Sequence, residues 1–155
     1  MTDASPRWLT KPELDVWVNV AQLLVLLPAA IDRQLREEAR IPHAYYLILA
    51  FLSGAPGRAM RMTDLARSVG TTTSRLSHAA ATLEERGWLQ RRACPTDKRG
   101  QIAQLTDTGM TVLEAAAPGH VAEVRRLFFD HLSADDVAQL QAITDKILPA
   151  LRPGT

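Results

Sequence analysis

The chain contains long segments whose apolar residues recur every three or four positions, separated by short segments rich in Gly, Pro and Thr. Over residues 12–40 this spacing predicts one apolar stripe on a long helix, formed by Val16, Val20, Leu23, Leu24, Leu27, Ile31 and Leu35. Pro28 lies inside the stripe and predicts a kink, because proline removes one backbone hydrogen bond of a helix. A second helix is expected to start at Pro42 and to end at Gly54, before a loop over residues 55–58.

Two short helical segments with a tight turn between them follow this loop. Thr63 is a suitable N-cap for the first helix, and Gly70 supplies the left-handed residue that ends it. Thr71 or Thr72 can cap the second helix, which is expected to stop before Gly87. Two helices joined in this way predict a helix-turn-helix.

A β-hairpin is expected after the second of these helices. Residues 88–92 can form a strand, Pro95 and Gly100 favour a turn, and residues 101–105 alternate polar and apolar side chains as a returning strand. Beyond the hairpin the chain is helical again, and Ser133 is a suitable cap for the last helix. The apolar faces of these C-terminal helices consist of Val112, Leu113, Val121, Val124, Leu127 and Phe128, then Val137, Leu140, Ile143, Ile147 and Leu151.

This order of elements predicts a mainly α fold with a small β wing. A winged helix-turn-helix module is expected over residues 56–108, flanked by dimerisation helices over residues 1–55 and 109–155, all within one intertwined domain. The terminal helices need a partner for their apolar stripes, and the simplest partner is the same stripe on a second copy of the chain.

Composition adds a soluble character and an uneven distribution of charge. The chain is 46% hydrophobic and 23% charged, as in ordinary globular proteins. Its net charge of +1 hides a centre, residues 58–101, with nine basic and four acidic side chains, so that the centre carries +5 and the remainder −4. A positive centre is suited to a polyanionic partner. The longest apolar run, residues 23–31, is too short to cross a bilayer, so we expect a cytoplasmic protein without a membrane partner.

Six short motifs make the pattern specific. In chain order they are Asp64-Leu65-Ala66, Gly70, Thr72-Thr73-Ser74-Arg75-Leu76-Ser77, Leu83-Glu84-Glu85-Arg86-Gly87-Trp88-Leu89, Asp97-Lys98-Arg99 and Leu105-Thr106-Asp107-Thr108-Gly109. Together they resemble the MarR family of winged helix-turn-helix transcriptional regulators. The resemblance implies a homodimer that binds double-stranded DNA at a pseudo-palindromic operator. It further implies a repressor that a small aromatic or phenolic effector releases.

The second helix of the helix-turn-helix predicts the main DNA contacts. Its first turn contains Arg75 and no carboxylate, although acidic residues normally stabilise the positive end of a helix dipole. A DNA phosphate would supply the missing negative charge, while Arg75 contacts a guanine edge in the major groove. The alternative is a solvated polar face. The residues expected at the DNA are Thr72, Thr73, Ser74, Arg75, Ser77 and His78.

The wing predicts a second anchor on DNA. Asp97 and Arg99 lie two residues apart, so the carboxylate can hold the guanidinium in one rotamer. In the family that the chain resembles, this arginine enters the minor groove and the aspartate orients it. Arg91, Arg92 and Lys98 are expected to add phosphate contacts, which do not depend on sequence and weaken with salt.

Four ring side chains are candidates for an effector cavity between the dimerisation helices and the winged module. They are Trp17, His43, Tyr45 and Tyr46, and the alternative interpretation is ordinary core packing. Neighbouring arginines suggest oxidant sensing by Cys94, but we favour a bystander thiol. His120 and His131 are the best pair for zinc between helices, yet the histidine spacing favours no metal and no cofactor.

Two other classes of function compete with a DNA-binding regulator. A winged helix can serve as a protein-interaction module without specific DNA binding, but Arg75 and the positive centre argue against that class. An enzyme is disfavoured because the sequence lacks a nucleophile–base pair. Ser77 and His78 are adjacent on a helix and therefore point in different directions.

Overall fold

The computed structural model describes residues 6–94 and 97–151 of the chain, with the backbone alone described for residues 97–99. Its elements follow the predicted order. They are α1 (Lys11–Glu38), α2 (His43–Ser53), the 3₁₀ turn η1 (Pro56–Arg58), β1 (Ala59–Arg61), α3 (Met62–Ser68), α4 (Thr73–Glu85), β2 (Leu89–Cys94), β3 (Asp97–Leu105), α5 (Asp107–Leu127), the 3₁₀ turn η2 (Phe129–His131) and α6 (Ala134–Leu151).

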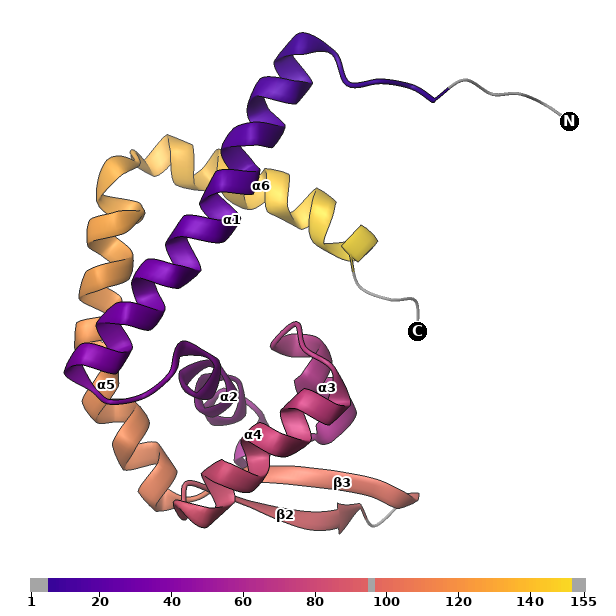
Figure 1. Ribbon diagram of the computed structural model, residues 1–155, viewed down its shortest axis with the longest axis vertical. Coiled ribbons are helices and arrows are strands. Elements are labelled where there is room, and N and C mark those ends of the chain that lie inside the picture. Colours follow the sequence, from indigo (N-terminus) through magenta and orange to yellow (C-terminus); the bar gives the residue numbers. More distant parts are fainter. Residues whose placement is uncertain (1–5, 95–96, 152–155) are drawn as a thin grey trace, which may run out of the picture.

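The elements form a compact module and an extended set of long helices (Figure 1). Helices α2, α3 and α4 pack with the β-sheet, whereas α1 and α5 pack against each other and extend away from this module. The C-terminal helix α6 follows α5 and contains no buried residue. The predicted fold class, mainly α with a small β wing, is therefore confirmed.

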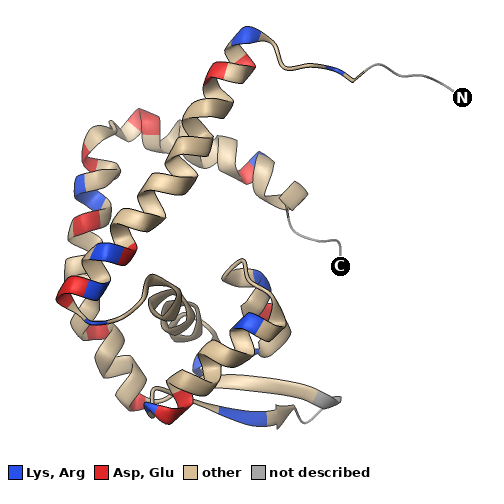
Figure 2. Ribbon diagram, viewed as in Figure 1, with Lys and Arg blue, Asp and Glu red and all other residues tan. Residues whose placement is uncertain are grey.

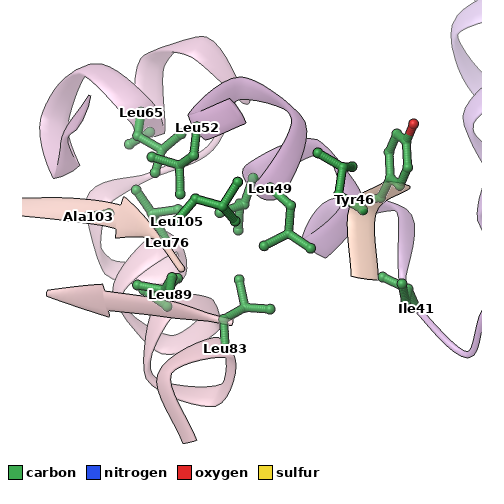
Figure 3. Close-up of a cluster of buried hydrophobic side chains, with 14 of the residues drawn as sticks. Ile41, Tyr46, Leu49, Leu52, Leu65, Leu76, Leu83, Leu89, Ala103 and Leu105 are labelled. Atoms are coloured by element: carbon green, nitrogen blue, oxygen red, sulfur yellow. The ribbon is translucent and has the colours of Figure 1, made fainter. Parts of the chain in front are cut away.

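The core lies in the module and is built mainly from leucine. Seven leucines from α1, α2, α3, α4 and β2 are fully buried, and several of them point toward one another in Figure 3: Leu35, Leu49, Leu52, Leu65, Leu76, Leu83 and Leu89. Leu49 and Leu52 come from α2, so this helix shares its core with the helix-turn-helix while also contacting α1 and α5.

The sheet contains a third strand that the hydrophobic pattern did not predict. Strand β1 follows the turn at Gly57 and pairs antiparallel with β3, which lies between β1 and β2. The sequence pattern predicts a loop over residues 55–58 and no strand after it. A strand of three residues is too short to display the alternation by which strands are predicted.

Threonine and serine caps fix four of the helix starts. Thr10 caps α1, because its hydroxyl accepts the backbone N–H of Glu13. Thr72, Thr106 and Ser133 each accept a backbone N–H from the first turn of α4, α5 and α6, respectively. The predicted cap at Ser133 is confirmed, and of the two candidates Thr71 and Thr72 it is Thr72 that caps α4. The prediction for Thr63 is wrong, because α3 already begins at Met62, directly where β1 ends, and Arg61 makes no side-chain cap.

The start of α5 is fastened to the turn between α4 and β2. The backbone N–H of Thr106 donates to Trp88 O at 3.1 Å, and its hydroxyl donates to Gly87 O at 2.6 Å. Gly109, in the first turn of α5, lies so close to this turn that a Cβ atom built on it would be 2.0 Å from Trp88 O. Only a glycine permits this approach.

Helix α1 has two different halves. It continues without a break through Pro28, and only its C-terminal half is buried, through Ile31, Gln34 and Leu35. Its N-terminal half carries exposed apolar side chains, among them Leu24, Val25 and Leu26. By length and composition alone α1 is long and apolar enough to cross a membrane, with a mean hydropathy of 1.8 in its most apolar window. The uninterrupted apolar run of residues 23–31 therefore understates the length of the apolar part of α1.

Candidate nucleic-acid interface

Helix α4 presents the residues predicted to contact DNA on its exposed side. Leu76, Ala80 and Leu83 anchor the helix in the core. The opposite side contains the exposed residues Thr73, Ser74, Arg75, Ser77 and His78, preceded by exposed Thr72. The first turn contains no acidic residue, so the positive end of the helix dipole faces solvent without a compensating charge from α4.

The hydroxyl groups on this side of α4 are not equivalent. Thr72 accepts the N–H of Arg75 at 3.2 Å, and Ser77 donates to Thr73 O at 2.8 Å, so both hydroxyls already serve the helix. In the described part of the chain the hydroxyls of Thr73 and Ser74 have no such partner. These two side chains, together with Arg75, are therefore the ones left to donate to an external acceptor.

A small cavity lies behind the start of α4. It measures about 320 Å³ and opens between α2 and the helix-turn-helix. Its wall is largely apolar, and among the described residues that line it Arg75 and His43 are the ionisable ones. The cavity therefore joins a residue predicted to read DNA with one predicted to line an effector site.

The two arginines of β2 have different surroundings. The Arg91 guanidinium donates twice to Oε2 of Glu84, from Nε at 2.9 Å and from Nη2 at 2.7 Å, and its backbone N–H donates to Oε1 at 2.9 Å. These bonds hold the pKa of the Glu84 carboxyl below its usual value. The sequence predicts that Arg91 contacts phosphate, but in the structure Arg91 joins α4 to the wing through Glu84.

Arg92 remains an exposed cation of the wing. It lies on the opposite side of β2 from Arg91 and pairs in register with Ile102 of β3. Figure 2 shows the two arginines as a basic band on β2. Asp97, Lys98 and Arg99 begin β3, but their side chains lie outside the described residues, so the predicted Asp97–Arg99 pair stays a prediction.

The four candidate effector residues do not line one cavity within a single chain. Trp17 borders an open groove of about 590 Å³ on the exposed half of α1. It precedes Asp32, which contacts the start of α2, by 15 residues or roughly 22 Å of helix. Tyr46 is buried in the core, Tyr45 is half-buried, and His43 borders the cavity beside Arg75. The core interpretation therefore holds for Tyr46.

Two residues that position the interface were not predicted as functional. Arg86, the C-cap of α4, places its guanidinium 5.0 Å from the Trp88 ring centre and 5.8 Å from that of Tyr45. Glu84 holds Arg91 as described above. The sequence does show that Glu84 and Arg91 have opposite charges. They are seven positions apart across a helix–strand turn, however, and this spacing alone does not predict that they form an ion pair.

The remaining candidates are one cysteine and two histidines. Cys94 is buried at the end of β2. The ring nitrogen Nε2 of His131 lies 3.0 Å from Arg126 O, whereas the ring of His120 lies against Tyr46. His120 and His131, the pair considered for zinc, therefore have different neighbours in the single chain.

A helix-turn-helix whose second helix offers an arginine and free hydroxyls, followed by a basic β-hairpin, defines the winged-helix class of nucleic-acid-binding proteins. Comparison with known proteins then identifies the family. The model of the MarR family matches residues 41–100. Sco3205, a MarR family transcriptional regulator from Streptomyces coelicolor, has 45% sequence identity and a TM-score of 0.88, covering 98% of this chain and 95% of that one. This chain belongs to the MarR family.

Two further relatives agree with this assignment. AbsC, a MarR family transcriptional regulator from Streptomyces coelicolor, has 35% identity and a TM-score of 0.85, covering 95% of this chain and 99% of that one. The transcriptional repressor MprA of Escherichia coli is 28% identical over 111 residues, which is 72% of this chain. The match spans 62% of the length of that repressor.

Proposed function

We propose that this chain is a cytoplasmic, homodimeric transcriptional regulator that binds operator DNA with α4 and the wing and has no catalytic activity. The single observation that carries the proposal is the exposed first turn of α4, with Arg75, two unengaged hydroxyls and no carboxylate. The relative with 45% identity, Sco3205, was solved in complex with DNA, which supports the same partner for this chain.

The proposed dimer explains the exposed apolar surfaces. The N-terminal half of α1 exposes large apolar side chains, and so does α6, through Val137, Ile143, Ile147, Leu148 and Leu151. Exposed apolar surface of this extent indicates a partner, and in an isologous dimer the same surface of a second copy covers it. Two copies of α4 then enter successive major grooves, about 10 base pairs apart, on a pseudo-palindromic operator.

We further propose that the regulator is a repressor released by a small aromatic or phenolic effector. The cavity between α2 and the helix-turn-helix supports an effector site, because a ligand there would contact His43 and Arg75 together. Tyr45 and Tyr46 do not line this cavity, and Trp17 would join the site only from a second copy. Binding would change the separation of the two modules and so lower the affinity for DNA.

The deciding experiment compares Arg75→Ala with a matched control on operator DNA. The DNA is the intergenic segment beside the gene, titrated at several salt concentrations and with nonspecific competitor. Arg75→Ala is expected to cost about 1–3 kcal/mol and to relax discrimination at one base per half-site. The control, Arg125→Ala, removes an exposed arginine of α5 outside the module and should leave the affinity unchanged.

Two results would count against this assignment. An equal loss on every DNA sequence would mean that Arg75 contacts only phosphate. Binding by the unmodified chain that is weak and abolished by competitor would favour the protein-interaction module, and a pull-down would then identify its partner.

A further inference from the structure

Two histidines from different helices meet where the long helices join the module. His43 is the first residue of α2, and His120 lies in the middle of α5. Their ring centres are 6.2 Å apart with the ring planes inclined by 32°, and the Tyr46 ring covers His120 at 4.2 Å. The sequence positions of these residues, 77 apart, gave no sign of this pairing.

The His120 ring lacks the hydrogen bond that a buried ring nitrogen normally makes. Its Nδ1 is buried and has no hydrogen-bond partner in the described parts of the chain. A buried polar atom without a partner costs about 1–3 kcal/mol, so native proteins rarely retain one unless a water or an ion satisfies it. The neighbouring imidazole of His43, whose ring centre is 6.2 Å away, indicates that this ligand is a metal ion that binds imidazole nitrogens.

The surroundings of the pair favour neutral imidazoles beside a negative charge. Burial lowers the pKa of His43, and burial together with the neighbouring His43 lowers the pKa of His120. Both rings are therefore neutral near pH 7 and have a lone pair to offer. The Asp32 carboxylate of α1 accepts the backbone N–H of His43 at 2.8 Å and also pairs with Arg36.

We propose that His43 and His120 together bind one divalent transition-metal ion of the Zn²⁺ class and thereby join the start of α2 to α5. Imidazole nitrogen suits zinc, nickel and cobalt. With Zn–N bonds of about 2.0–2.1 Å, two imidazoles on a tetrahedral ion place their ring centres about 5 Å apart. The observed separation of 6.2 Å is about 1 Å longer than a shared ion requires, so the rings must move closer together when the ion binds.

The remaining coordination positions are open to water or to an added ligand. Among the described residues no group of three or more His, Cys, Asp or Glu side chains gathers around an ion, so the protein supplies these two ligands. His43 also borders the cavity of about 320 Å³ behind the start of α4, whose lining does not include His120. The site thus has two ligands on separate elements, both with neutral rings.

The test uses Co²⁺ as a spectroscopic probe on tag-free, full-length protein treated with a chelator and then dialysed. Co²⁺ is titrated while its visible d–d absorption is recorded, and Zn²⁺ is then added in competition. One Co²⁺ per chain is expected, displaced by Zn²⁺, with binding weakened at least tenfold in His43→Gln and in His120→Gln. His78→Gln and His131→Gln, which remove exposed rings elsewhere, should bind Co²⁺ like the unmodified chain.

The proposal fails if the unmodified chain binds no Co²⁺, if both pair variants retain binding, or if the control variants lose as much. Circular dichroism checks that each variant folds. If a pair variant does not fold, the zinc X-ray absorption spectrum of the unmodified protein decides the question. Two imidazole ligands on the zinc would support the site, and the absence of imidazole ligands would exclude it. These measurements involve no DNA, so their outcome is independent of the proposed regulatory function.

Discussion

At the scale of the residue, Gly109 has the least room for a side chain among the glycines with described surroundings. A Cβ atom there would lie 2.0 Å from Trp88 O and 2.8 Å from the Leu105 side chain. We expect Gly109→Ala to lower the free energy of unfolding by about 3 kcal/mol or more, since backbone must move to relieve the clash. Urea unfolding followed by circular dichroism measures this loss.

A second glycine of the same helix provides the control for this prediction. The Cβ of Gly119→Ala would meet the side-chain ends of Glu38 and Gln34, which are flexible. Since alanine also favours the helix, the net change should stay within about 1 kcal/mol. Equal losses in the two variants would show that α5 does not depend on the close approach to Trp88.

Individual residues also mark the limit of what the sequence could predict at the interface. The sequence limited the cap of α4 to Thr71 or Thr72 because the capping pattern is local, and the exposed side of α4 followed from its helical period. Arg91 and Arg92 are adjacent and identical in type, so nothing local distinguishes the arginine that pairs with Glu84 from the exposed one. That distinction depends on how β2 folds back toward α4.

At the scale of the element, the Glu84–Arg91 pair determines how the wing is held relative to α4. We expect Arg92→Gln to reduce the slope of log affinity against log salt by about 1 for each lost phosphate contact. Arg91→Gln should weaken DNA binding without changing this slope, because Arg91 positions the wing and does not contact phosphate. Fluorescence anisotropy over a range of salt concentrations distinguishes the two.

The same pair predicts a dependence on acid. The folded-state pKa of Glu84 lies below its ordinary value of 4.5, so the pair contributes stability above that pH. The contribution is lost as the pH falls through the folded pKa. In Glu84→Gln the difference from the unmodified chain should therefore shrink below about pH 4.5, as seen in urea unfolding at several pH values. A constant difference at all pH values would contradict the prediction.

The elements that periodicity could predict are the long ones and those with local punctuation. The two long terminal helices, the helix-turn-helix and the hairpin all follow from spacing, caps and turn residues. Strand β1 and the start of α3 are set by pairing with β3, which is more than 40 residues away, and no local pattern records such a partner. The meeting of His43 and His120 likewise depends on the packing of α2 against α5.

At the scale of the whole molecule, the exposed half of α1 predicts an obligate dimer. Leu26 is 66% exposed in the single chain, and a charge at this position would have to be buried between two copies. Leu26→Glu is expected to raise the dimer dissociation constant by at least about 100-fold. Light scattering during size-exclusion chromatography at several concentrations measures the change.

The control for the dimer is Thr108→Glu, which adds the same charge to an exposed position in the first turn of α5. It should leave the dimer intact, because an acidic residue is favourable at a helix start. A monomeric unmodified chain that enters lipid vesicles would overturn the dimer and favour a membrane role for α1.

The bonds from Thr106 to Gly87 and Trp88 leave no flexible joint between α5 and the turn that follows α4. Rotation of one α5 helix against the other in a dimer is therefore transmitted to α4 in each copy. We therefore expect the dimer to bind weakly to an operator whose half-sites are correct but wrongly spaced. Inserting or deleting a base pair between the half-sites should lower the affinity as much as a mismatch within one of them.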